Sequence, residues 1–239
     1  KKLLFDPFIS GNGMASGIDV NSIEADYILL SHGHQDHILD AESIAKRCDA
    51  TIISNFEIVS WYEPKGVKGH PMNHGGKYTF DFGTVKYVNA IHSSVLPDGT
   101  YGGNPGGFVI WNDENCFYMA CDTALTYDMK LIPLMCPKLD FAVLPMGDNF
   151  TMGIEEAVMA SSFIECKNNI GFLHSFIKTF EHFFYWLTFF FKALFIYLVI
   201  LSTLWIQIKT FRLDHIIGKT DLFVILIKKN PSKMNKSRP

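Results

Sequence analysis

The loop at residues 31–37 limits what this chain can fold into more than any other segment. An apolar run at residues 27–30, with the composition of a buried strand, leads into it. Within six residues the loop carries the ligand-type side chains His32, His34, Asp36 and His37. Imidazole and carboxylate groups are ligands that zinc, manganese and iron accept. The spacing therefore predicts a metal site after a strand, with Gly33 expected to let the backbone turn. A surface loop that is rich in histidine by chance is the alternative.

Three later segments follow this loop in order, at residues 90–94, 121–123 and 144–153. Together with the pattern His-x-His-x-Asp-His, they resemble the metallo-β-lactamase superfamily. Within it, they are similar to the uncharacterised metal-dependent hydrolases related to the ascorbate-6-phosphate lactonases. The similarity covers residues 1–171. It implies an α/β fold, the αββα sandwich, with metals at one edge of two facing sheets.

The resemblance also implies roles for single residues. It makes His92 the third imidazole of a metal site that contains His32 and His34. It makes Asp122 a bridge between two metals, because the two oxygens of a carboxylate can each bind one cation. Without the first motif, His92 alone would be read as an ordinary hydrogen-bonded histidine.

Asp36 and His37 complete the second metal site in this interpretation, and Asp36 is also the predicted catalytic residue, which orients the attacking hydroxide. The expected cofactor is a pair of divalent metals, zinc in the first place and manganese or iron otherwise. A metal-bound hydroxide would then attack a small anionic ester, lactone or phosphoester. Ser31 and Thr123 are expected either to orient ligands or to act as ordinary polar caps.

The segment Gly147, Asp148 and Asn149 is the predicted substrate-binding element. It precedes an expected helix, so its backbone N–H groups either bind an anion or cap that helix. His70 and His74 match no ligand position and are expected in an exposed loop. Cys121, which precedes Asp122, is expected to be a small buried side chain, with a functional role as the alternative.

The family pattern breaks near the end of the similar region. The last histidine of the pattern is expected two residues after a glycine, but His174 stands three residues after Gly171. A shift by one residue in a strand turns a side chain to the opposite face. His174 is therefore a metal ligand only if the chain compensates, and without it the second site is weak or empty. The start of the chain is expected to be truncated, because relatives have preceding strands.

Composition changes sharply after residue 171. Residues 1–171 carry 11 Lys and Arg against 21 Asp and Glu, a net charge of −10, and residues 172–239 carry 10 against 3, a net of +7. Seventeen of 18 glycines lie in the first part and 11 of 21 phenylalanines in the second. The apolar segment 183–206 reads either as a transmembrane helix followed by a basic tail or as the product of a frameshift or a retained intron.

Three functions remain open from the sequence: a metal-dependent hydrolase, a catalytically impaired metal-binding fragment, and a membrane-tethered module. The expected partner is a small-molecule substrate. Membrane attachment is expected only if the segment 183–206 forms a transmembrane helix. The chain could also form a homo-oligomer. Nucleic acid is not expected, because the acidic part has no basic stripe. Five widely spaced cysteines and no visible signal peptide indicate a reducing compartment, the cytoplasm.

Periodicity and turn residues predict the elements that carry these motifs. Strands are expected at residues 3–5, 27–31, 50–54, 77–82, 84–89, 107–111, 116–120 and 141–144. Helices are expected at residues 40–47, 56–63 and 154–164, the first with Asp40 as its N-cap.

Overall fold

The computed structural model describes residues 1–172 and 223–226. They belong to one of two compact units of the chain, the one formed by Lys1–His174 and Ile216–Pro239. Within the described residues, no helix is both long enough and apolar enough to cross a membrane. His174 and the segment 183–206 lie outside the described residues, so what the sequence suggests for them stays a prediction.

The first sheet has five strands in the order β11-β1-β2-β3-β4. Its strands are β1 (Lys2–Phe5), β2 (Tyr27–Leu29), β3 (Thr51–Asn55), β4 (Gly69–Met72) and β11 (Phe223–Leu226). Strands β1 to β4 are parallel, whereas β11 pairs with β1 in the antiparallel sense. The carboxyl ends of β1, β2 and β3 therefore meet at one edge of this sheet.

The second sheet has six strands in the order β10-β9-β8-β7-β6-β5. Its strands are β5 (Lys77–Phe80), β6 (Gly83–Asn89), β7 (Gly106–Trp111), β8 (Cys116–Met119), β9 (Phe141–Pro145) and β10 (Asn169–Phe172). The hairpins β5–β6 and β7–β8 are antiparallel, as their turn residues predict, and β8, β9 and β10 run parallel.

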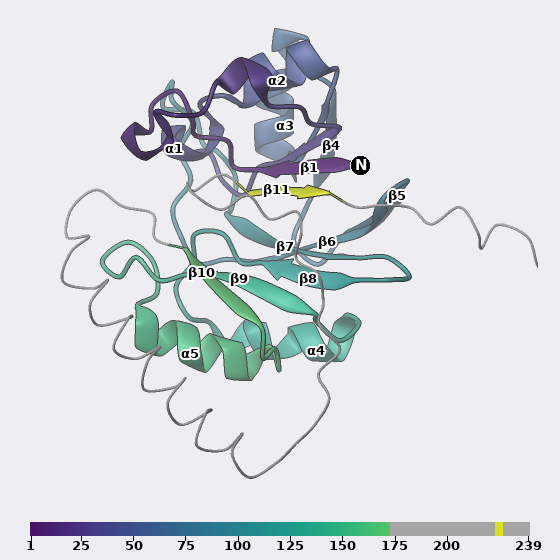
Figure 1. The fold of residues 1–239 in the computed structure, drawn as a ribbon, viewed down its shortest axis with the longest axis vertical. Helices are drawn as coiled ribbons and strands as arrows, with labels where there is room; N and C mark the ends of the chain where they lie inside the picture. Colours follow the sequence, from purple (N-terminus) through teal and green to yellow (C-terminus); the bar gives the residue numbers. More distant parts are fainter. Residues whose placement is uncertain (173–222, 227–239) are drawn as a thin grey trace, which may run out of the picture. The chain divides into compact units, whose positions relative to one another are not determined.

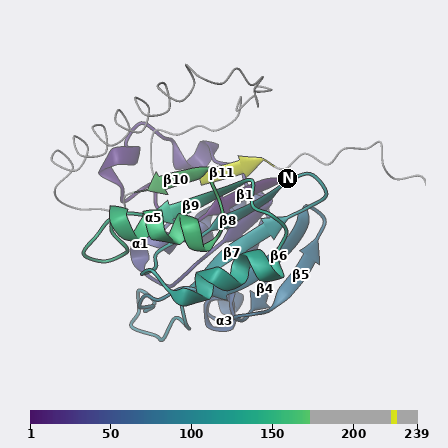
Figure 2. The same ribbon diagram turned by 90° about the horizontal axis from the view of Figure 1, so that it is seen from below.

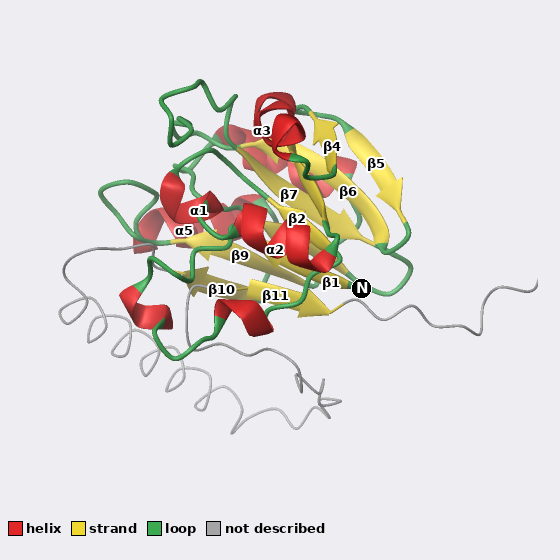
Figure 3. Cartoon of the chain, turned by 90° about the horizontal axis from the view of Figure 1, so that it is seen from above, coloured by secondary structure: helices red, strands yellow, loops and turns green. Residues whose placement is uncertain are grey.

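Helices cover the outer face of each sheet (Figure 1). Figure 3 shows α2 (Ala41–Cys48) and α3 (Phe56–Tyr62) over the five-stranded sheet, with α1 (Gln35–Ile38) beside them. On the other side, α5 (Ile154–Phe163) lies across the six-stranded sheet (Figure 2), and α4 (Ile132–Met135) packs there too. Short 3-10 helices occupy Gly13–Ala15, Val20–Ser22, Glu63–Lys65 and Tyr127–Leu131. The predicted αββα sandwich is confirmed.

Alternate residues of the central strands face different cores. Leu29 packs between the two sheets with Phe108, whereas Ile28 packs against the outer helices with Ile44. Both faces of β2 are therefore buried, which is why its sequence is continuously apolar instead of alternating. A third core lies between the six-stranded sheet and α5, where Tyr118 is fully buried.

Two local predictions need correction. Asp40 does precede α2, but its side chain caps no helical amide; its carboxylate accepts from Ile9 and Ser10 instead. His70 is not in a loop but in β4, an edge strand of the first sheet, and is half-buried. Proline and glycine are rare in strands, and their presence around His70 hid this strand from the sequence interpretation.

Candidate metal centre

Three imidazoles meet at the edge where the central strands end. His32 and His34 follow β2, and His92 follows β6. The ligand atoms of these three side chains all lie within 4.8 Å of one another. His32 Nε2 is 2.9 Å from His34 Nδ1, and the His92 ring centroid lies 4.9 Å from that of His32. The structure thus brings the three predicted imidazoles together from two sheets, which sequence spacing alone does not require.

A second group of side chains lies directly beside the first. His37 Nε2 is 3.3 Å from Asp122 Oδ2, and the same oxygen is 3.8 Å from His92 Nε2. Asp122 follows β8 and is buried, so its carboxylate lies between the three-imidazole cluster and His37. This is the placement that a bridging ligand requires, and the role itself stays a prediction.

The tautomers of His32 and His37 follow from a single carboxylate, that of Asp6. Asp6 accepts from the Ser31 hydroxyl at 2.6 Å, so that hydroxyl oxygen is left to accept from His32 Nδ1 at 2.8 Å. Asp6 also lies 3.1 Å from His37 Nδ1, which must carry the hydrogen because a carboxylate can only accept. On both rings Nε2 is therefore the atom that faces the site.

Serines of the segment that follows His92 bind the first histidine loop. Ser93 Oγ lies 3.2 Å from His34 Nε2, which leaves Nδ1 of that ring facing His32. Ser94 Oγ accepts from Gly33 N at 3.0 Å and donates to Gly102 O at 2.9 Å. These contacts attach the segment that follows His92 to the loop that carries His32 and His34.

Glycine at position 33 serves a different purpose from the backbone turn that the sequence suggested. Its φ is not positive, so the turn does not require glycine. A Cβ atom at Gly33 would instead lie 3.2 Å from Leu96 Cγ, closer than ordinary van der Waals contact. Gly33 therefore allows the segment after His92 to approach the histidine loop.

Burial and charge set the protonation of the imidazoles. Burial lowers the pKa of His34 and of His92 below the ordinary value, which keeps both rings neutral and able to bind a metal. Burial also acts to lower the pKa of His37, but hydrogen bonds to Asp122 and Asp6 outweigh it and raise that pKa to about 10. His37 thus carries a proton at neutral pH when no metal is bound.

The donor set fits divalent metals. With its Nδ1 hydrogen directed at Asp6, a neutral His37 would turn an Nε2 lone pair toward the carboxylate of Asp122. Two lone pairs 3.3 Å apart repel unless a cation, either a proton or a metal, lies between them. Neutral imidazoles and carboxylates are also ligands that zinc, manganese and iron share.

Asp36 lies in the first turn of α1, directly before His37. Its negative charge acts to raise the pKa of both His34 and His92, which places Asp36 within electrostatic reach of the cluster. Its assignments as a ligand and as the catalytic residue stay predictions.

The predicted substrate-binding loop reaches the site through its neighbour, Phe150, whose backbone acts to raise the pKa of His92. The amides of Gly147 and Asp148 are engaged within the loop, donating to Thr151 Oγ1 and Met152 O. Thr123 supports the other side, since its hydroxyl accepts from Ile91 N at 2.9 Å. Substrate binding by Gly147, Asp148 and Asn149 stays a prediction.

Sequence interpretation missed Asp6, and it missed that the serines after His92 attach their segment to the histidine loop. Asp6 stands before a proline and reads as an ordinary turn residue. The available signal was its position after a strand, because parallel strands place their carboxyl ends at one edge. Cys121, by contrast, is buried as expected, and burial raises the pKa of its thiol far above the ordinary value.

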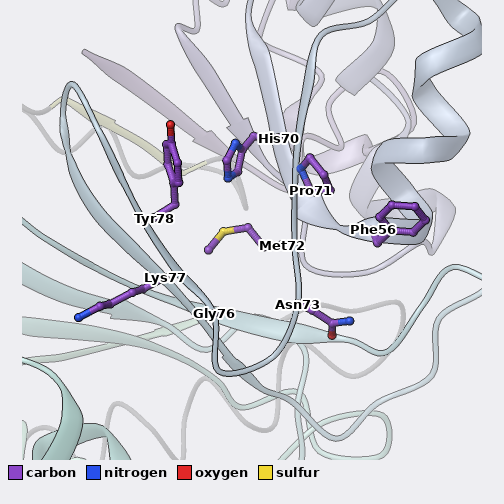
Figure 4. A pocket seen from close by; sticks show the side chains of 8 residues that line it. All are labelled: Phe56, His70, Pro71, Met72, Asn73, Gly76, Lys77 and Tyr78. Carbon is purple, nitrogen blue, oxygen red and sulfur yellow. The ribbon is translucent and has the colours of Figure 1, made fainter.

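A cavity of about 410 Å³ lies apart from these residues (Figure 4). It is lined by β4, β5 and the start of α3, through Phe56, His70, Pro71, Met72, Asn73, Gly76, Lys77 and Tyr78. None of the predicted ligands lines it. His74, just beyond it, lies 2.8 Å from Pro105 O through Nε2, which is a structural contact.

Comparisons with known proteins agree with this geometry. Residues 1–168 match the model of the beta-lactamase superfamily domain. A UPF0173 metal-dependent hydrolase from Flavobacterium johnsoniae is 62% identical over 172 residues, covering 72% of this chain and 76% of that protein. A second one, from Christiangramia forsetii, is 64% identical over 170 residues, covering 71% of this chain and 75% of that protein.

Among solved structures, a metallo hydrolase from the hyperthermophilic archaeon Ignicoccus hospitalis is similar, with a TM-score of 0.60 and 29% identity. The match covers 71% of this chain and 73% of that one. The motifs, the sandwich and these matches all lead to one assignment. The chain belongs to the beta-lactamase superfamily and, within it, to the UPF0173 metal-dependent hydrolases.

Proposed function

We propose that this metal-dependent hydrolase cleaves a small ester, lactone or phosphoester with two divalent metals, zinc in the first place. The observation that carries the proposal is the convergence of His32, His34 and His92, whose ligand atoms lie within 4.8 Å, beside the Asp122–His37 pair. Divalent metals held there lower the pKa of a bound water and polarise an oxygen of the substrate.

Different side chains would bind the metals, transfer the proton and orient the ligands. His32, His34 and His92 would hold one metal, and His37 and Asp36 a second, with Asp122 shared between them. Asp36 would accept the proton of the attacking water at a carboxylate oxygen, since it is only half-buried in the first turn of α1 and its charge acts on both His34 and His92. Asp6 and Ser31 keep the ring hydrogens of His37 and His32 turned away from the reacting atoms.

The proposal extends to the place of action, the cytoplasm. All five cysteines are free, and three of them are buried. Unpaired buried thiols are typical of proteins that fold in a reducing compartment. Retention of free thiols in protein isolated under non-reducing conditions, after blocking with an alkylating agent in the lysate, supports this placement, and disulfide-linked species contradict it.

The test is the metal content of the purified full chain, with a His32→Ala variant and a His70→Ala control. We expect about two equivalents in the full chain and in the control, and a loss in His32→Ala. Hydrolysis of 4-nitrophenyl acetate, 4-nitrophenyl phosphate and γ-butyrolactone should depend on that metal. One equivalent without turnover supports the alternative of a catalytically impaired metal-binding chain, and unchanged metal in His32→Ala contradicts the assigned site.

A further inference from the structure

Four exposed apolar side chains stand on the segment that carries the ligand His92 and on the predicted substrate-binding loop. Ile91 is 53% exposed, Val95 47%, Tyr101 60% and Phe150 76%. Exposing side chains of this size to water is unfavourable, and several of them on segments that flank one site are typical of a surface that binds an apolar group. We call these four residues the apolar rim.

Two members of the rim are attached to ligand residues directly. Ile91 precedes His92, and its N–H and carbonyl are bonded to Thr123 Oγ1 and Ala124 N, next to Asp122. The backbone of Phe150 acts to raise the pKa of His92, so it lies beside that ring. The main chain of both residues therefore lies next to the site.

The other two members are joined to the histidine loop through Ser94. Val95 and Tyr101 pair as an isolated antiparallel bridge. Ser94, adjacent to Val95, binds Gly33 N, and it donates to Gly102 O, adjacent to Tyr101. One short hairpin thus carries two rim side chains and is bonded to the segment that holds His32 and His34.

These loops offer an anion no cationic side chain away from the metals. Residues 31–37, 90–105, 120–126 and 146–153 contain no lysine and no arginine. They do contain carboxylates, Asp36, Asp98, Asp122 and Asp148. The amides of Gly147 and Asp148, which could otherwise bind an anion, already donate within their own loop. A carboxylate or phosphate remote from the reacting bond would find no cationic partner on these loops.

We propose that the part of the substrate remote from the scissile bond is uncharged and apolar, and that Phe150 and Tyr101 bind it. The proposal rests on the proposed function, because it describes the substrate of the same metal centre. It replaces the expectation of an anionic substrate with esters, lactones or phosphoesters whose remote group is apolar. Compounds that carry a phosphate or carboxylate away from the scissile bond should be poor substrates.

The experiment uses the metal-loaded full chain and three hydroxamates, which bind metal centres without being cleaved. Acetohydroxamate has no remote group, octanohydroxamate has an apolar chain, and suberic monohydroxamate has a chain of equal length that ends in a carboxylate. Dissociation constants are measured by isothermal titration calorimetry. We expect octanohydroxamate to bind at least roughly tenfold more tightly than acetohydroxamate, because burial of two methylene groups suffices for that gain. The terminal carboxylate should remove most of it.

Variants test whether the apolar rim causes the preference for octanohydroxamate. Phe150→Ala and Tyr101→Ala should each reduce the preference for octanohydroxamate at least about threefold while leaving the affinity for acetohydroxamate unchanged. Leu134→Ala is the matched control, since Leu134 is equally exposed on α4 but is not on a ligand-bearing loop. Equal affinity for acetohydroxamate and octanohydroxamate, with metal bound, overturns the proposal and leaves the proposed function intact. A chain that binds neither metal nor acetohydroxamate contradicts both.

Discussion

Asp6 Oδ2 lies 3.1 Å from His37 Nδ1, and the same oxygen accepts the hydroxyl hydrogen of Ser31. Through Ser31 it also directs the Nδ1 hydrogen of His32. One carboxylate therefore determines which nitrogen two of the predicted ligands turn toward the site. Asp6 has a positive φ of 42°, a backbone conformation that aspartate and asparagine tolerate better than most residues.

Replacing Asp6 should weaken metal binding without direct loss of a predicted ligand. Asp6→Asn keeps an acceptor and the backbone conformation, so we expect about a tenfold loss of metal affinity. Asp6→Ala should lose up to about 100-fold and also lower stability, because Ser31 N then loses its acceptor. Competition with a chromophoric chelator measures the affinity. Wild-type affinity in Asp6→Ala contradicts the role assigned to this carboxylate.

The raised pKa of His37 makes metal binding release a proton. Without metal, His37 is protonated below a pKa of about 10, against 6.5 for an ordinary histidine. This interaction stabilises the metal-free fold fully below pH 6.5, and the stabilisation is lost as the pH rises through about 10. Metal titrations at pH 8 in buffers of different ionisation enthalpy should therefore show proton release, which should fade above pH 10. Release that does not change across this range contradicts the prediction.

Ser94 should matter for metal binding although it is not a ligand. Ser94→Ala removes the acceptor of Gly33 N and the donor to Gly102 O, so the hairpin after His92 loses its attachment to the histidine loop. We expect metal affinity to fall roughly tenfold. Ser94→Thr should restore much of it, because the hydroxyl is kept. Ser161→Ala is the control, since its hydroxyl donates to Val158 O within α5, and it should leave the affinity unchanged.

Tyr118→Phe should stabilise the fold. The hydroxyl of Tyr118 is fully buried and has no hydrogen-bond partner among the described residues. Removing such a group should raise the free energy of unfolding by about 1 kcal/mol. In the control Tyr62→Phe, the lost hydroxyl donates to Ile38 O at 3.3 Å, so stability should fall by a similar amount. Urea denaturation of the two variants should therefore give shifts of opposite sign, and a destabilised Tyr118→Phe contradicts the prediction.

Elements with clear local signals could be predicted from the sequence. The β5–β6 hairpin forms where Gly83 adopts a φ of 145°, a conformation that favours glycine, and the apolar run at Tyr27 forms a strand buried on both faces. Strand β4 could not be predicted, because Gly69 and Pro71 are typical of loops. Only an edge position, where a proline without N–H can be tolerated, allows it to pair.

The candidate site also contains residues that could be predicted from the sequence and one that could not. His32, His34 and His37 stand close together in the sequence, so their meeting could be predicted. Asp6 lies 25 residues before Ser31 and contacts it only because β1 and β2 pair in parallel. A contact that depends on strand pairing leaves no local pattern in the sequence, and this is why Asp6 was missed.

Every predicted ligand among the described residues stands beyond the end of a strand, and the three cores contain none of them. The apolar side chains that form the cores and the predicted ligands are thus different residues. Loops at this edge can change in length or sequence while the strands keep their register. A lineage built on this sandwich can therefore exchange one substrate for another through a few loop substitutions, without having to evolve a new fold.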